Sequence, residues 1–340
     1  MENLINGLKN NRAFAFSSFL VLLLIGIALA APLLAPYDPL EATMKNAYLP
    51  PSSEHIFGTD KLGRDNFSRV LYGASYSLSS VLLLVAVIFA VGTSLGVLAG
   101  YFGGKVDTVI MRISDMMISF PGMILAIAIA GILGGSLINA IIALTIVTWT
   151  KYARLARSMV LKIKKRDFVE AAVVNGGKPT HILWKHIVPN ILPLMIITAA
   201  SDIGAMMMEL AGLSFLGFGS QPPTPEWGLM LNEGRQQLQT APWLMFFPGL
   251  AIFLTVVVFN LWGDSLRLKK KSFFKKRKIY QINRQNCQFV YLLFAFKQVE
   301  YLHNVSGGVI GGKKYGGRNI RRRTAGGKNS VGCGRQCAFA

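Results

Sequence analysis

Long apolar stretches separated by polar segments dominate the chain. Each is about long enough, as a helix, to cross the ~30 Å hydrocarbon layer of a bilayer. The pattern predicts an all-α, polytopic membrane protein with six transmembrane helices. The six predicted spans are residues 14–34, 76–101, 112–133, 137–153, 190–212 and 244–263. We interpret 14–34 as an uncleaved first helix; a cleaved signal peptide is the alternative, because residues 28–31 are small.

The distribution of Lys and Arg predicts the orientation of these helices. Residues 151–189 contain nine Lys and Arg but only two acidic residues. Short loops rich in basic residues stay in the cytoplasm, so we expect this loop inside and residues 35–75 and 220–243 outside. Six helices in this arrangement place both termini in the cytoplasm.

Composition supports this class and isolates the C-terminal tail. With 52% hydrophobic and 15% charged residues, the chain does not resemble an ordinary soluble protein. Of the net charge of +20, most belongs to residues 265–340, which hold 18 basic residues and one acid. All three cysteines also lie there, so residues 1–264 have no disulfide or thiolate metal site. We divide the chain into a first helix with an external loop (1–75), a five-helix core (76–267) and a basic tail (268–340), which we expect to be disordered or out of frame.

Two local patterns concern helix packing. Gly92, Gly96 and Gly100 recur every four residues, which predicts a stripe where another helix backbone approaches closely. Pro121-Gly122 predicts a kink inside the third span.

The loop at 151–189 has more pattern than a plain connector. Apolar residues recur at helical spacing from Tyr152 to Asn175, and Gly176-Gly177 then predicts a turn into a second helix capped by Thr180. The helix-turn-helix would be a rigid projection, in which small alanines allow a partner to approach and Glu170 offers one charge. An amphipathic helix lying on anionic lipid is the alternative.

Several motifs together resemble a known family. Glu170-Ala171-Ala172, Gly176 and Ile187-Val188-Pro189-Asn190 resemble the EAA loop of ABC-importer permease subunits, specifically those of the dipeptide/oligopeptide/nickel branch. Further stretches in the same order are similar to that branch. They lie at residues 57–65, 107–121, 213–219 and 222–228, within a resemblance covering about 10–267.

The resemblance implies a MetI-like permease fold in the cell inner membrane. It implies a second permease subunit, two cytoplasmic ATPase subunits and an extracytoplasmic solute-binding protein as partners, with peptides or nickel as solute. The ATPase-coupling residues would be Glu170, Ala171, Ala172 and Gly176. ATP and Mg²⁺ would bind the partner ATPase, so this chain would need no cofactor and would not be an enzyme. Its one near match to a phosphate-binding loop, residues 307–314, has Lys314 where Ser or Thr would hold Mg²⁺.

Acidic residues within the spans are candidates for function, because an unpaired charge in lipid is costly. We expect Asp115 to pair with Arg112, three residues away on the same helix. Asp202 and Glu209 are seven residues apart and share a helix face, so they are candidates to line the pathway and meet an amine or a cation. A hydrogen bond to a neighbouring subunit is the alternative. No histidine lies in a span, so we predict no metal site.

Two other functional classes compete with the importer subunit. A stand-alone secondary transporter would need inverted repeats, and we find none. A membrane-anchored protein binding lipid or nucleic acid would rest on the basic tail alone; we expect no nucleic-acid partner. The abrupt loss of acidic residues after 264 suggests translation in a shifted frame, which the gene's nucleotide sequence would test.

Deletion of residues 268–340 separates these classes. We expect transport by the complete system to be unchanged, because the resemblance ends near residue 267. Uptake of labelled solute into cells, at matched membrane expression, measures this. A loss of uptake with normal expression would contradict the prediction and favour a function in the tail.

Overall fold

The computed structural model describes residues 12–267, and this part of the chain is helical. Within it the only β-type pairing is an isolated bridge between Thr59 and Asp65. The predictions for residues 268–340 lie outside the described residues. The long helices are α2 (Arg12–Leu34), α3 (Asn66–Phe102), α6 (Leu137–Lys164), α9 (Val188–Phe215) and a last helix, Trp243–Arg267. The shorter ones are α4 (Gly104–Ile118), α5 (Gly122–Leu133), α7 (Asp167–Val174), α8 (Pro179–Ile182) and α10 (Trp227–Gly234).

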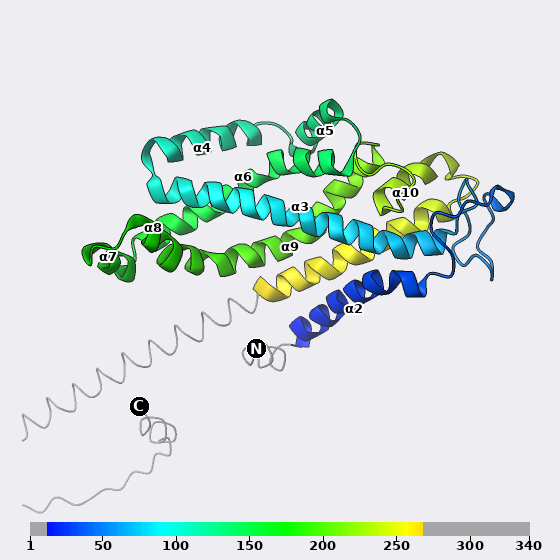
Figure 1. The fold of residues 1–340 in the computed structure, drawn as a ribbon, viewed down its shortest axis with the longest axis horizontal. Coiled ribbons are helices and arrows are strands. Elements are labelled where there is room, and N and C mark those ends of the chain that lie inside the picture. Colours follow the sequence, from blue (N-terminus) through cyan, green and yellow to red (C-terminus); the bar gives the residue numbers. More distant parts are fainter. Residues whose placement is uncertain (1–11, 268–340) are drawn as a thin grey trace, which may run out of the picture. The chain divides into compact units, whose positions relative to one another are not determined.

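The long helices run side by side between two ends of the described part (Figure 1). One end carries α7 and α8, and we call it the α7 end; the other carries α10 and residues 35–65, and we call it the α10 end. Trp262 Nε1 donates to Ser18 Oγ at 3.2 Å, which joins the start of α2 to the final turns of the last helix. The backbone N–H of Tyr37 donates to Ser68 Oγ at 3.2 Å, which joins the end of α2 to the start of α3.

Each of the six predicted spans contains helix, but the third is not one continuous helix. Residues 112–133 are divided between α4 and α5, whose axes meet at 94°. Pro121 causes the break, because it has no N–H to donate and it disfavours helical backbone at Phe120. The predicted kink is therefore confirmed.

Length and hydropathy identify four helices that could cross a membrane, or five if the bent pair counts as one span. The four are Arg12–Leu34, Asn66–Phe102, Pro179–Phe215 and Trp243–Arg267. Helix α6, where 137–153 was predicted as a span, is not among them. Its second half contains Lys151, Arg154 and Arg157, which lower its hydropathy although its first half is apolar.

The most extensive helix–helix contact in the described part of the chain joins α3 to α6, along the predicted glycine stripe. A Cβ atom added to Gly92 would lie 2.6 Å from the carbonyl oxygen of Trp149, and one added to Gly100 would lie 2.8 Å from Val160 Cβ. At Gly96 the added atom would overlap the backbone of Ala153. The absence of side chains on α3 thus lets the two backbones touch, as the sequence predicted.

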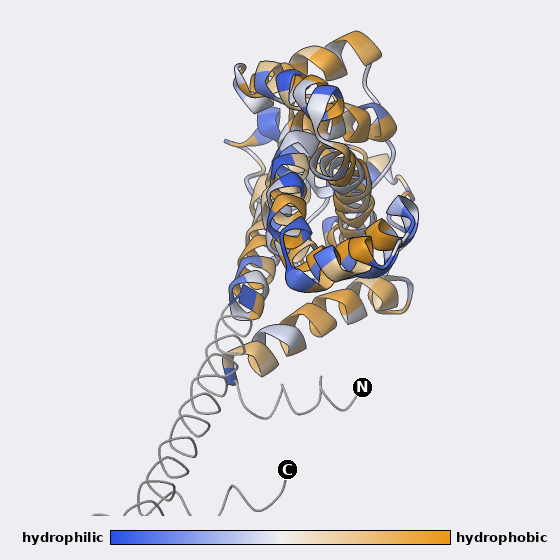
Figure 2. Cartoon of the chain, turned by 90° about the vertical axis from the view of Figure 1, so that its left-hand side faces the viewer, coloured by the Kyte–Doolittle hydropathy of each residue, from blue (hydrophilic) through white to orange (hydrophobic). Residues whose placement is uncertain are grey.

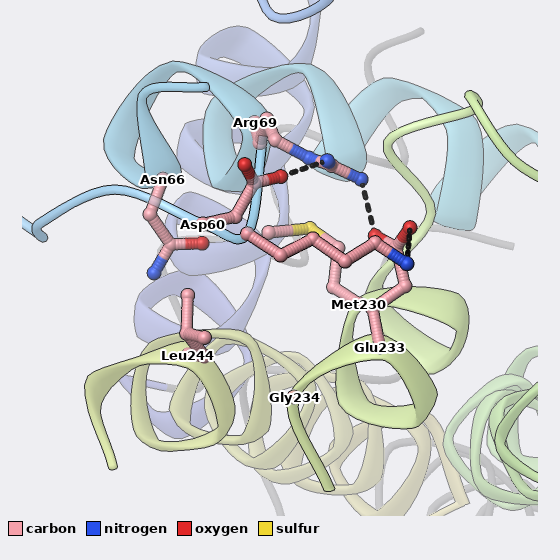
Figure 3. A pocket seen from close by; sticks show the side chains of 8 residues that line it. Asp60, Asn66, Arg69, Met230, Glu233, Gly234 and Leu244 are labelled. Atoms are coloured by element: carbon pink, nitrogen blue, oxygen red, sulfur yellow. Dashed lines mark hydrogen bonds and ion pairs between the residues drawn. The ribbon is translucent and has the colours of Figure 1, made fainter. Parts of the chain in front are cut away.

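A network of buried charges closes the α10 end (Figure 3). Arg69, from the first turn of α3, contacts Asp60 Oδ2 through Nη1 at 2.6 Å and Glu233 Oε2 of α10 through Nη2 at 2.8 Å. Arg64 Nε also contacts Asp60 Oδ2 at 2.6 Å. The Arg64 and Arg69 side chains are 2% and 1% exposed, and the network borders a cavity of about 20 Å³. These pairs attach the segment before α3, which contains Asp60 and Arg64, to α10, which lies far away in the sequence.

Short helix α10 begins with a strong cap. Both carboxylate oxygens of Glu226 accept backbone hydrogen bonds, from Gly228 and Leu229, each at 2.9 Å. Burial raises the pKa of Glu226 above its usual range, while the two backbone N–H groups act in the opposite direction. The cap satisfies N–H groups that would otherwise be buried without partners.

Replacement of Gly96 by leucine tests the α3–α6 contact. The side chain would overlap Ala153, so we expect a loss of stability of at least ~1–3 kcal/mol, seen as a lower midpoint of thermal unfolding in detergent. Gly26→Leu on α2 is the matched control, because an added Cβ there meets no atom within 4 Å. Equal midpoints for the two variants would contradict this packing.

The charge network makes a second prediction. Glu233→Gln removes a carboxylate that faces two buried guanidinium groups, so we expect a loss of ~3–5 kcal/mol. Glu41→Gln is the control, because Glu41 is exposed at the same end. Thermal unfolding of both variants in the same detergent measures the difference, and a change in Glu41→Gln as large as that in Glu233→Gln would refute the assignment.

Candidate functional site

The predicted helix-turn-helix lies at the α7 end, and its helices begin and end at other residues than expected. Helix α6 stops at Lys164, and α7 starts anew at Asp167 after extended backbone at Arg166. A single helix from Tyr152 to Asn175 was therefore wrong. Thr180 does not cap the next helix, because α8 begins at Pro179 and its N-cap, Lys178, makes no side-chain cap. Proline suits this position, since the first helical residue needs no N–H donor.

The predicted turn at the double glycine closes α7 with a defined hydrogen-bond pattern. The Gly176 N–H donates to the Val173 carbonyl and the Gly177 N–H donates to the Ala172 carbonyl, both at 3.0 Å. Gly176 has φ +73°, a conformation that side chains with a Cβ avoid. This is a Schellman motif, and it fixes the direction in which the chain leaves α7.

The inner face of the turn is anchored to the long helices. Val169, Ile182 and Ile187 are buried and belong to the main hydrophobic core. Tyr101, at the end of α3, donates from its hydroxyl to the Pro179 carbonyl at 2.8 Å. Lys164 Nζ donates to the Tyr101 carbonyl at 2.9 Å. The turn is therefore held from both α3 and α6.

The outer face of α7 is open and partly apolar. Of the four predicted coupling residues, Glu170, Ala171 and Gly176 are exposed, whereas Ala172 is partly buried and packs against the core. Sequence reasoning missed the two most exposed apolar side chains of residues 165–187, Val174 at 86% and Trp184 at 69%. Figure 2 views the molecule from this end, where hydrophilic and hydrophobic residues lie side by side. The signal for these residues was their place near the glycine turn, where residues 12–267 leave them uncovered.

Helix α6 carries three basic residues that each pair with an acid on another helix. Lys151 Nζ lies 2.7 Å from Asp202 Oδ2 on α9, and Arg154 Nη2 lies 2.6 Å from Asp115 Oδ1 on α4. One turn further on, Arg157 Nη2 donates to Asp107 Oδ2 at 2.6 Å. We call these three pairs the α6 ion pairs.

The α6 ion pairs show which of the acids predicted within the spans have a basic partner. Asp115 pairs with Arg154 and not with Arg112, so that prediction was wrong; the partner lies on another helix. Asp202 is buried, and Tyr152 Oη donates to it at 3.1 Å in addition to the lysine. Its charge is thus already compensated. Glu209, two helical turns along α9, is only partly buried and has no hydrogen bond or ion pair within residues 12–267.

The described residues offer no protein-built metal site, because no three His, Cys, Asp or Glu side chains in residues 12–267 gather around one point. His181 and His186 are neighbours, with ring centroids 6.1 Å apart, but no third ligand joins them. A structural site usually has four ligands and a catalytic site three.

Comparison with known proteins assigns the chain to a family. The model of the family described as "Binding-protein-dependent transport system inner membrane component" matches residues 92–271. The model described as "N-terminal TM domain of oligopeptide transport permease C" matches residues 5–51.

Three curated relatives agree with these matches. The dipeptide transport system permease protein DppC of Alkalihalophilus pseudofirmus is 44% identical over 76% of this chain and 86% of its own length. The nickel transport system permease protein NikC of Escherichia coli is 42% identical over 73% of this chain and 90% of its own. The glutathione transport system permease protein GsiD of Pectobacterium atrosepticum is 44% identical over 76% and 86%.

A chain of the inward-facing MetNI methionine ABC transporter superposes with a TM-score of 0.49 at 20% identity, covering 60% of this chain and 97% of that one. That likeness is too partial to carry an argument. The family model covers more than half of the chain, and the relatives match most of it. The chain belongs to the family of binding-protein-dependent transport system inner membrane components.

Proposed function

We propose that the chain is one of two permease subunits of an ATP-driven importer and forms half of its translocation pathway. A second permease subunit, two ATP-binding subunits and a solute-binding protein would complete the transporter, with ATP and Mg²⁺ held by the ATPase. The observation that carries the proposal is the rigid, outward-facing α7 on a chain of this family. A loop anchored on two long helices can pass on a displacement that a flexible loop would absorb.

We also propose six membrane crossings with both termini and α7 in the cytoplasm. The bent pair α4–α5 and helix α6 would supply the two crossings that length and hydropathy alone leave open. Two observations support this orientation. The Trp262–Ser18 hydrogen bond joins the start of the first helix to the final turns of the last, as an even number of crossings requires. The α7 end also carries the exposed bases Lys162, Lys165, Arg166, Lys178 and Lys185.

In this proposal α7 docks on the ATPase through Glu170, Ala171 and the apolar side chains beside them. Gly176 and Ala172 would act from behind by holding the turn: Gly176 through its backbone conformation, Ala172 through its carbonyl and its contact with the core. From α7 the chain continues through α8 and a π-helical segment, Leu183–Ile187, directly into α9. Movement of the ATPase would therefore reach a helix that crosses the membrane.

The solute class follows from the relatives only as a proposal. Their names state dipeptide, nickel and glutathione transport, at 42–44% identity to this chain. We propose a small solute of this kind, a peptide or nickel, free or as a chelate. The solute-binding protein would discriminate between solutes to a large extent before a solute reaches this chain.

Val174→Arg tests the docking face. Val174 is 86% exposed among the described residues, so we expect normal folding but at least a roughly tenfold weaker association with the ATPase subunits. Co-purification of the ATPase and uptake by reconstituted transporter would both fall. Val174→Ile is the matched control, because it keeps the apolar contact. It should retain both the co-purification of the ATPase and the uptake.

Gly176→Pro tests the turn separately from the surface. Proline cannot adopt φ +73°, so α7 should be misdirected and ATP hydrolysis should continue with reduced uptake. Full uptake and full ATPase association in both Val174→Arg and Gly176→Pro would overturn the coupling role of this loop.

A further inference from the structure

Glu209 differs from the other acids on the helices that carry the α6 ion pairs. Asp107, Asp115 and Asp202 each contact a base of α6 within 2.7 Å. Glu209 lies two turns beyond Asp202 on α9 and has no such partner in residues 12–267. In lipid or in a protein interior, an uncompensated carboxylate is costly. The ionised form of Glu209 would therefore gain from a cationic partner outside the described residues.

The surroundings of Glu209 point to a positive charge as its partner. Within the described residues the charges of Lys151 and Asp202 act on it, and these two already pair with each other at 2.7 Å. When the Glu209 carboxyl is ionised, the group of three carries one excess negative charge. Glu209 is also not enclosed: it is partly exposed, and Met208 beside it is 57% exposed. A cationic group could reach the carboxylate from that side without displacing an ion pair.

We propose that the Glu209 carboxylate binds the positively charged group of the solute while the solute crosses the membrane. This rests on the function proposed above and names the chemistry of the site. A peptide with a free amino terminus brings an ammonium group, and nickel brings a divalent cation, so both solute classes supply the charge. Glu209 would favour such solutes over anions, and Asp202 would serve as the fixed partner of Lys151, without contact to solute.

The first experiment measures the charge at the site without any solute. All native cysteines lie at 287, 333 and 337, so replacing them with serine leaves a chain free of thiols. In this background, Met208→Cys in the complete reconstituted transporter is labelled with a cationic and with an anionic methanethiosulfonate of similar size. The carboxylate should favour the cationic reagent, and adding Glu209→Gln should lower the ratio of the two rates by roughly tenfold.

Ile196→Cys is the matched control on the same helix. Ile196 is 52% exposed and lies thirteen residues, or about 20 Å, from Glu209, so Glu209→Gln should leave its rate ratio unchanged. If the thiol of Met208→Cys does not react, or if Glu209→Gln does not change its rate ratio, a neighbouring subunit covers the carboxylate and the proposal is overturned.

The second experiment asks which cation binds. During ATP turnover, a dipeptide with a free amino terminus, or Ni²⁺, should slow the labelling of the Met208→Cys thiol when Glu209 is present and not when it is replaced by glutamine. An N-acetylated dipeptide should not slow it. If neither the dipeptide nor Ni²⁺ protects this thiol, solute binding at Glu209 is wrong even if the rate ratio changes.

Failure here is distinguishable from failure of the proposed function. The reagent ratio needs no solute, and the docking of α7 on the ATPase is tested by co-purification. A transporter that couples normally but shows no effect of Glu209 would retain the permease function and lose only this site.

Discussion

The contact between α3 and α6 determines how the rest of the described chain is arranged. Gly92, Gly96 and Gly100 leave no room for a side chain, so the two backbones lie against each other over more than two helical turns. Without a hydrophobic driving force between helices in lipid, this closeness gives dispersion contacts that longer side chains would prevent. The register of α6 on α3 follows directly, because each glycine lies against a particular turn of α6.

That register has consequences along the second half of α6. It presents Lys151, Arg154 and Arg157 to acids on α9 and α4. The basic residues of α6 thereby hold both α9 and α4 to it. It also brings Lys164 to the carbonyl of Tyr101, and through Tyr101 the turn after α7 is held to α3. At the α10 end, Arg69 of α3 extends the same frame to Glu233. One helix pair therefore positions the loop, the ion pairs and the α10 end.

Much of this could be predicted from sequence, because its signals are local. Apolar length located the helices, four-residue spacing located the glycine stripe, and the double glycine located the turn after α7. The predictions failed where the outcome depended on backbone geometry or on contacts between residues far apart in sequence. Pro121 signalled a kink but not its 94° angle, and Asp115 was paired with nearby Arg112 because Arg154 is distant in sequence. The break at Lys165–Arg166 carries neither glycine nor proline, so no residue type announced it.

The candidate site shows the same difference between what a local motif predicts and what only the fold determines. Glu170, Ala171, Ala172 and Gly176 were found from a motif, yet only the folded chain separates those that face outward from Ala172, which packs inward. Asp202 and Glu209 look equivalent in sequence, two acids on one helix face. The lysine that distinguishes them comes from another helix.

The π-helical segment Leu183–Ile187 sets the rotation between the two parts of the long helix that it joins. A π turn contains one residue more than an α turn, and one residue corresponds to about 100° around an α-helix. The extra residue of the π turn therefore rotates α9 relative to the loop about the helix axis. Gain or loss of one residue in this segment would turn α9 by about 100° relative to the loop and present another of its faces to the neighbouring helices, with the loop itself unchanged.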